Sequence, residues 1–204
     1  MHPLRRGTVL RYSLIALSVL LGAVIRFWNF DSYEVQYVAA FQRAALAANL
    51  VGFFQLYTHL GDSIAWVGLA LLLFAFYYKR PRKAVKFALF LTAVAAVTTT
   101  LRFIFPRVRP CQGFPTQVQA YYNCQGVPAY PSGHVAPAAG GLYLLANHSR
   151  KLNVLFGALV VLLALSRVAI GAHFFTDVIG SALFSYPIAA IIDDMTLFER
   201  FKDR

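Results

Sequence analysis

Long apolar runs recur along this chain of 204 residues and constrain its fold more than any other feature. A helix needs about 20 mainly apolar residues to cross the hydrocarbon core of a bilayer. The fourth run is short, but its Gly140-Gly141 pair suits close packing between helices. We therefore predict an all-α fold, a six-helix transmembrane bundle. Its spans are expected near residues 10–28, 63–78, 85–105, 135–147, 152–170 and 175–192.

The segment between the first two spans is more polar than the spans themselves. Residues 32–50 mix charged and amide side chains with apolar ones, which favours an interfacial amphipathic helix over a seventh span. No small-x-small cleavage site follows the first span, so we expect an uncleaved anchor rather than a signal peptide. Residues 1–204 are expected to form one membrane domain.

The net charge of +11 is spread between the apolar runs and does not form one patch. This distribution favours topology signals and contact with lipid headgroups, and no nucleic-acid-binding motif is present. With the amino terminus inside, 13 of the 19 Lys and Arg residues fall on the cytoplasmic side. We therefore expect a multi-pass protein of the cell membrane with both termini cytoplasmic. The arginines on the opposite side are Arg26, Arg43, Arg102, Arg107, Arg109 and Arg167.

Four of those six outer arginines lie close to three polar segments. Their position on the outer side goes against the general excess of Lys and Arg on the cytoplasmic side. The segments lie at the outer ends of spans three to six, which one helical bundle brings together. They also contain two of the five histidines in a chain that is only 13% charged. The segments read Arg102-x6-Arg109-Pro110, Pro131-Ser132-Gly133-His134 and Ser166-Arg167-x5-His173-x3-Asp177.

The residue types in these segments suit phosphate chemistry. Arginine offers a rigid fork of donors for phosphate oxygens, and backbone N–H groups at Ser132 and Gly133 precede a predicted helix. His173 and Asp177 are four residues apart, so the carboxylate can fix the tautomer of a nucleophilic imidazole. His134, from another segment, can act first as general acid and then as base. No Gly-x-Ser-x-Gly context supports a serine nucleophile.

Other polar residues receive simpler interpretations. We expect His2, His59 and His148 to be interfacial polar residues rather than catalysts. Arg107 is expected to be a solvated loop charge, with contact to substrate as the less favoured alternative. Cys111 and Cys124 share one polar loop, and no nearby His or Cys completes a zinc set. A disulfide is expected if that loop is outside the cytoplasm, and two unlinked thiols are the alternative.

The three segments resemble the signature of the type 2 phosphatidic acid phosphatase family, which groups lipid phosphate phosphatases with vanadium haloperoxidases. The family pattern is Lys-x6-Arg-Pro, Pro-Ser-Gly-His and Ser-Arg-x5-His-x3-Asp. The second and third segments match it fully, whereas Arg102 stands in place of the usual lysine. This replacement keeps the charge but changes reach and geometry. The resemblance covers residues 60–192.

The resemblance implies a metal-independent phosphatase without a cofactor that works through a phosphohistidine. It also implies six transmembrane helices with the site at the outer face. His173 would be the nucleophile, Asp177 its partner and His134 the proton donor. The implied phosphate-binding residues are Arg102, Arg109, Arg167, Ser132 and Gly133.

The expected substrate is a membrane lipid phosphate. A polyprenyl diphosphate carrier is favoured, because the short chain leaves room for little beyond lipid and headgroup and a phosphate monoester is a good leaving group. Phosphatidylglycerol phosphate, phosphatidic acid and lipid A phosphates are the alternatives. Six apolar spans oppose a soluble haloperoxidase. The absence of an inverted repeat or of paired broken helices opposes a non-enzymatic transporter or scaffold with an anion site.

Overall fold

The computed structural model describes residues 6–77, 82–122, 124, 126, 128–146 and 148–195, and these residues contain helices and no strand. The predicted ends of the second and fourth spans, at residues 78 and 147, lie outside the described residues, as do both chain termini. The elements are α1 (Arg6–Phe27), α2 (Asp31–Ala47), α3 (Val51–Tyr57), a 3-10 turn η1 (Thr58–Gly61), α4 (Ser63–Phe76), α5 (Arg82–Ile104), α6 (Pro110–Gly113), α7 (Val135–Ala146), α8 (Arg150–Ala169) and α9 (Phe175–Asp194).

Four helices, α1, α5, α8 and α9, are long and apolar enough to cross a membrane. They correspond to the first, third, fifth and sixth predicted spans. Helices α4 and α7 are apolar but have only 14 and 12 residues. The pair formed by α2 and the α3–η1 segment bends by 108° and would make a fifth candidate if it were one broken span. The all-α class is thus confirmed, while the count of six spans and the interfacial helix stay predictions.

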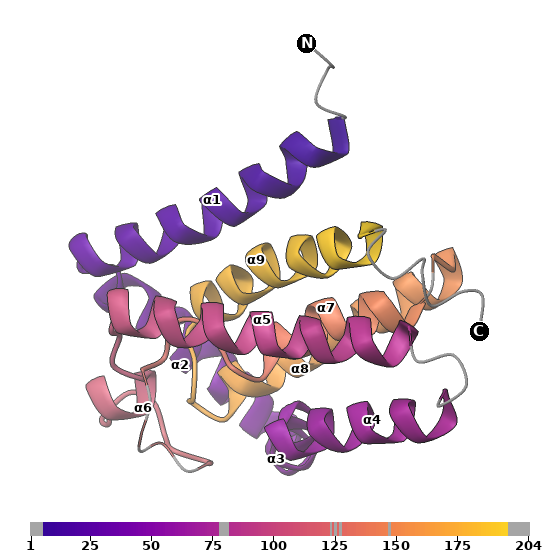
Figure 1. Cartoon of the computed structure of the whole chain (residues 1–204). Coiled ribbons are helices and arrows are strands. Elements are labelled where there is room, and N and C mark those ends of the chain that lie inside the picture. Colours follow the sequence, from indigo (N-terminus) through magenta and orange to yellow (C-terminus); the bar gives the residue numbers. More distant parts are fainter. Residues whose placement is uncertain are drawn as a thin grey trace.

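The helices form a bundle in which α7 lies between α5, α8 and α9, and α1 packs along α9. Figure 1 shows α1, α5, α7 and α9 running in similar directions, with α2 and α6 gathered at one end of the bundle. That end also holds the carboxyl end of α5 and the amino end of α9. The chain therefore brings the three polar segments to one end of the bundle.

Close packing of α7 depends on its two glycines, as the sequence predicts. A Cβ at Gly140 would collide with the ring of Phe90 and lie 2.8 Å from the carbonyl oxygen of Ser185 on α9. A Cβ at Gly141 would lie 2.9 Å from the ring of Trp66 on α4. The Gly140 N–H donates to the Ser185 hydroxyl at 3.2 Å. Small residues thus let a short helix approach its neighbours closely enough to hold the polar segment that precedes it.

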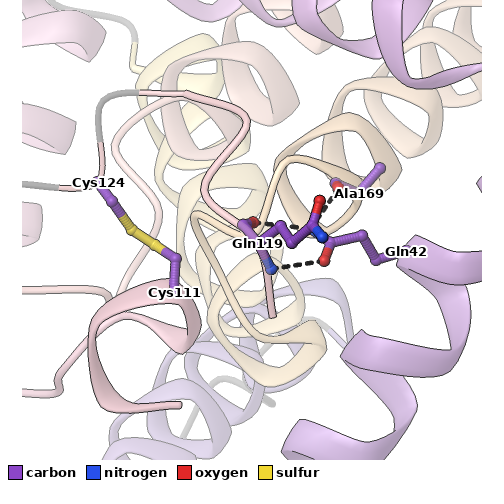
Figure 2. Close-up of a disulfide and its surroundings, with 5 residues drawn as sticks. All are labelled: Gln42, Cys111, Gln119, Cys124 and Ala169. Carbon is purple, nitrogen blue, oxygen red and sulfur yellow. Dashed lines mark hydrogen bonds between the residues drawn. A yellow bond between two sulfur atoms is a disulfide. The ribbon is translucent and has the colours of Figure 1, made fainter. Parts of the chain in front are cut away.

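Among its described residues, the loop between α5 and α7 is irregular apart from the short helix α6. In this loop the structure pairs Cys111 with Cys124 in a disulfide, and their Cα atoms are 6.4 Å apart (Figure 2). Gln42 of α2 bonds both the N–H and the carbonyl of Gln119 at 2.8 and 2.9 Å, and also bonds the Ala169 carbonyl at 3.0 Å. The Gln42 amide therefore ties the loop to the end of α8.

The turn from α8 to α9 has a conformation that requires glycine. Gly171 has φ of +78°, in the left-handed region, and a Cβ there would collide with the carbonyl of Gln119. The Cys111 N–H donates to the Gly171 carbonyl at 3.2 Å, and the Tyr121 N–H donates to the Ile170 carbonyl at 3.2 Å. The disulfide-bearing loop consequently lies directly against the turn that leads to His173.

Candidate active site

The structure brings the three polar segments together from four helix ends. Arg102 lies in the last turn of α5, Arg167 in the last turn of α8, and Asp177 in the first turn of α9. The Arg102 Nε donates to the Pro131 carbonyl at 3.3 Å, and a Cβ at Gly133 would lie 2.8 Å from Arg102 Nη2. Gly133 thus leaves room for the Arg102 guanidinium beside the turn that precedes α7.

Ser132 is held by both α7 and α9: its carbonyl accepts the Ala136 N–H at 3.1 Å. Its N–H donates to the Ser181 hydroxyl at 2.7 Å, and that hydroxyl donates to the Asp177 carbonyl at 2.6 Å. Tyr130, two residues earlier, is fully buried and its hydroxyl contacts Ser18 of α1. The turn carrying Ser132 and Gly133 is therefore fixed at the amino end of α9.

His173 is fully buried in the turn just before α9, next to Asp177. Its Nδ1 lies 3.5 Å from Asp177 Oδ2, an ion-pair distance that is long for a hydrogen bond. The sequence interpretation placed both residues on one helical face, but α9 begins at Phe175. The two side chains meet because Asp177 caps the helix: its Oδ2 accepts the Phe174 N–H at 2.8 Å, which turns the carboxylate back toward His173.

The surroundings of the His173 imidazole favour its neutral form. Burial, and then the positive charges of Arg167 and Arg109, lower its pKa well below the ordinary value. Within the part of the chain that the structure describes, neither ring nitrogen has a hydrogen-bond partner. Buried polar atoms nearly always have partners, so an unpaired neutral imidazole beside a carboxylate has the features of a nucleophile.

The positive charges of three arginines act on this imidazole. Arg167 is fully buried; its Nη1 donates to Thr58 Oγ1 at 2.7 Å, and its Cζ lies 5.2 Å from the ring centre of Tyr122. Its Nε is buried without a partner among the described residues. Arg109 is also buried, and burial lowers its pKa, while Arg102 is half-buried. Clustered cations of this kind repel one another and need an anion between them, which a phosphate group would supply.

His134 has a different environment, on the side of the site nearer α4. Its Nε2 lies 2.9 Å from Asp62 Oδ1, and the other Asp62 oxygen lies 2.8 Å from His59 Nδ1. Burial, and then the charge of Arg167, lower the pKa of His134 to about 4, although Asp62 acts in the opposite direction. A Cβ at Gly61 would lie 2.7 Å from His134 Cβ, so glycine is needed for this approach.

Sequence reasoning missed two residues of this site. Asp62 received no role in the sequence analysis, but it contacts His134, which is 72 positions away. Arg107 was expected to be solvated, but its side chain is only 2% exposed and pairs with Asp177 at 2.6 Å. A usable signal was the scarcity of carboxylates: the chain has only eight, so each one in a polar segment is a candidate partner for a cation.

The remaining histidines are outside this cluster. His148 is exposed and lies 3.1 Å from Asp193, and His59 reaches the site only through Asp62. His2 lies outside the described residues. Among the residues described, no group of three or more His, Cys, Asp and Glu side chains could hold a metal ion.

The protein is thus a helical membrane bundle with a buried His–Asp pair and three arginines at one end. The family model described as "PAP2 superfamily" matches residues 83–197, more than half of the chain. The chain belongs to this superfamily. Among curated proteins, none matches the chain.

Solved structures that share the fold include the following two. One is the transmembrane PAP2 type phosphatidylglycerolphosphate phosphatase from Bacillus subtilis, with a TM-score of 0.73 and 23% identity over 90% of this chain and 94% of that chain. The other is Aquifex aeolicus LpxE, with a TM-score of 0.63 and 20% identity over 80% of this chain and 96% of that chain. The fold is therefore that of PAP2 membrane phosphatases, and the protein is a multi-pass membrane protein.

Proposed function

We propose that this protein hydrolyses a phosphate monoester or diphosphate of a membrane lipid through a phosphohistidine at His173. The observation that carries the proposal is the buried imidazole of His173, which has no hydrogen-bond partner among the described residues and lies within the electrostatic influence of three arginines. An imidazole in this setting has a free lone pair for phosphorus, and the arginines bind the group that it attacks.

In the first step, the phosphoryl group binds Arg102, Arg109 and Arg167, together with the backbone at Ser132 and Gly133. A ring nitrogen of His173 attacks phosphorus, and the bond to the leaving oxygen breaks. The imidazole gains positive charge in this step, which the neighbouring Asp177 carboxylate stabilises. His134 gives its proton to the leaving oxygen, so that an alcohol or a phosphate monoester departs.

In the second step, water attacks the phosphohistidine. His134, now neutral, accepts a proton from this water, and the P–N bond breaks to release inorganic phosphate and restore His173. The half-exposed position of His134 supports this role, because the base must contact both water and the leaving oxygen. Asp62 orients the ring through its 2.9 Å contact with Nε2.

The reaction is proposed to need no metal ion. Phosphoryl transfer requires neutralisation of the equatorial oxygens, and three arginines provide this charge directly. Phosphate release should be unchanged by EDTA. Loss of activity with EDTA that a divalent ion restores would contradict this part of the proposal.

A lipid substrate is supported by a cleft of about 290 Å³ between α4 and α5. The cleft begins at Arg102 and Gly133, where the phosphate would bind, and continues past apolar side chains such as Trp66 and Val94. An acyl or prenyl chain that lies in this cleft would leave its phosphate at the arginines. The lipid would then approach from the bilayer rather than from water.

We propose a polyprenyl diphosphate as the substrate. Burial lowers the pKa of His134 to about 4. The proposed general acid therefore releases its proton readily, but only a small fraction of His134 is protonated near neutral pH. A diphosphate leaves as a phosphate monoester, which needs less proton assistance than an alkoxide. Phosphatidylglycerol phosphate is the second candidate, because the Bacillus subtilis structure with the same fold is a phosphatidylglycerolphosphate phosphatase. Phosphatidic acid and lipid A phosphates complete the set of alternatives.

The proposed arrangement is one domain over residues 1–204, in which α4 and α7 complete six spans and α2 lies at the membrane interface. The excess of Lys and Arg on one side supports cytoplasmic termini and an extracytoplasmic site. Labelling of single cysteines placed at either end of α8 in a cysteine-free background would test this. Accessibility from outside at the Arg150 end would contradict the orientation.

The direct test is phosphate release by the purified protein from each of the four lipid classes. We expect the highest kcat/KM with the polyprenyl diphosphate. A preference for phosphatidylglycerol phosphate would overturn the choice of lipid but keep the reaction. Absence of phosphate release from all four, in a protein that remains folded in detergent, would overturn the reaction itself.

A further inference from the structure

Arg107 connects helix α2 to the amino end of α9 through four side chains. Its Nη1 donates to Asp177 Oδ1 at 2.6 Å and to Thr176 Oγ1 at 2.7 Å. Its Nη2 donates to Glu34 at 2.9 Å, and its Nε donates to Asp31 at 2.9 Å. All three guanidinium nitrogens are therefore used inside the protein, and none is left to bind substrate.

The contact with Arg107 determines how the Asp177 carboxylate is oriented. Oδ1 accepts from Arg107, whereas Oδ2 accepts the Phe174 N–H at 2.8 Å and faces His173. The guanidinium also stacks on the Phe174 ring, with Cζ 3.8 Å from the ring centre. With both oxygens held, the carboxylate presents a fixed edge to the imidazole.

Glu34 controls the charge of this arrangement as well as its geometry. It is 5% exposed, and it accepts from the Thr176 N–H at 2.7 Å and from the Thr176 hydroxyl at 2.6 Å. Without other acidic partners, the positive charge of Arg107 would neutralise the negative charge of Asp177. Because Glu34 and Asp31 neutralise Arg107, the charge of Asp177 remains available to the imidazole cation that forms during attack.

A purely structural role for this cluster predicts a different result from a positioning role. Breaking a buried ion pair lowers stability in either case, so unfolding measurements do not distinguish the two. A positioning role lowers the rate of the step in which His173 gains charge. It leaves binding of the ground-state phosphate, which depends on the three arginines facing the substrate, nearly unchanged.

We propose that Arg107 and Glu34 are positioning residues for the nucleophile, acting through Asp177 on His173, so that α2 belongs to the catalytic apparatus. This inference rests on the proposed phosphatase reaction. It assigns a function to a helix that the sequence suggested was only interfacial, and to an arginine that the sequence suggested was solvated.

The test measures kcat and KM of Glu34→Gln and Arg107→Lys with the preferred lipid. We expect each variant to lower kcat about 10- to 100-fold, the range found for residues that orient a ligand or base, with KM changed less than about twofold. Glu34→Gln is nearly isosteric, so it decides the question if Arg107→Lys fails to fold. Asp194→Asn is the matched control: it removes a carboxylate that pairs with Arg11 at the far end of α9, and kcat should stay at the wild-type value.

The double variant adds a second readout. Because both residues act through one carboxylate, Glu34→Gln with Arg107→Lys should lose no more rate than the worse single variant. A wild-type kcat in folded Glu34→Gln, or a loss confined to KM, would overturn the inference, as would multiplicative losses in the double variant. These outcomes differ from failure of the proposed function, in which the wild-type protein itself would release no phosphate.

Discussion

The two histidines of the site have opposite surroundings. The His173 side chain is 1% exposed and lies against Asp177, whose carboxylate is fixed from behind by Arg107. The His134 side chain is 21% exposed, and its partner Asp62 is 32% exposed. Both rings have a carboxylate neighbour, but only one of the two pairs is closed to solvent.

This difference matches what each proposed step requires. A nucleophile benefits from removal of water and from a ring held in one orientation, since both reduce the reorganisation needed for attack. A group that transfers protons to a leaving oxygen and from water must reach both. The surroundings of the two pairs therefore fit the proposed roles, attack on phosphorus for the buried pair and proton transfer for the half-exposed pair.

Removal of the His173 imidazole should lower kcat more than any other change. His173→Ala is expected to lower kcat by about 1,000-fold or more, because the proposed covalent intermediate forms on this ring. Phosphate release with saturating lipid measures this loss. His148→Ala, at an exposed histidine that contacts Asp193, is the control and should keep wild-type activity. A fully active His173→Ala variant would refute covalent catalysis at this position.

Removal of the half-exposed ring should have a smaller effect that depends on the leaving group. His134→Gln is expected to lower kcat about 100- to 10,000-fold with a lipid alkyl phosphate, the usual range for a general acid. With a diphosphate, whose leaving group needs less proton assistance, the loss should be smaller. Equal losses with both substrates would contradict the assignment of His134 as proton donor.

Asp62, the partner of His134, should affect the pH dependence of kcat. Bonds from His59 and His134 lower the pKa of Asp62 despite its burial, so its carboxylate is charged and favours protonated His134. In Asp62→Asn this support is lost while the charges of Arg167 and Arg109 remain, so the pKa of His134 falls further. The acid form then disappears at a lower pH, and the alkaline limb of the kcat profile should move toward acid. A shift toward alkaline pH would contradict this contact.

The disulfide should affect stability far more than chemistry. Cys111 and Cys124 are 13 positions apart, and a loop of this size contributes about 3 kcal/mol in the chain-entropy account. We expect the paired Cys→Ser variant to melt at a lower temperature in detergent, with kcat at saturating lipid nearly unchanged. Alkylation with and without reductant, read by mass, tests the pairing itself. Free thiols in the native protein would refute it.

The sequence predicted the long helices and the segments of the site well, because both depend on local features. Apolar runs of sufficient length gave the spans that became α1, α5, α8 and α9. The spacing of polar residues at their ends indicated the histidines, Asp177 and the three arginines that the structure brings together. Glycines at 140 and 141 indicated the close packing of α7.

Features that depend on distant contacts were not predictable in the same way. The bend of 108° between α2 and α3 is marked in the sequence only by Asn49, which follows α2 with φ of +56°. Arg107 was misjudged because its partners Asp31 and Glu34 are more than 70 positions away, on a helix that was assigned no role in the site. Asp177 meets His173 through a helix cap, a geometry that i,i+4 spacing alone does not distinguish from a shared helical face.

The central claim is that the buried ring, rather than the half-exposed one, forms the covalent intermediate. In the test, the enzyme is mixed with lipid that is labelled in the transferred phosphate, and the reaction is quenched rapidly without acid. Peptide mapping then locates the label. The account predicts an alkali-stable, acid-labile label on His173 that accumulates in His134→Gln. A label on His134, or no labelled enzyme in that variant while phosphate is still released, would contradict it.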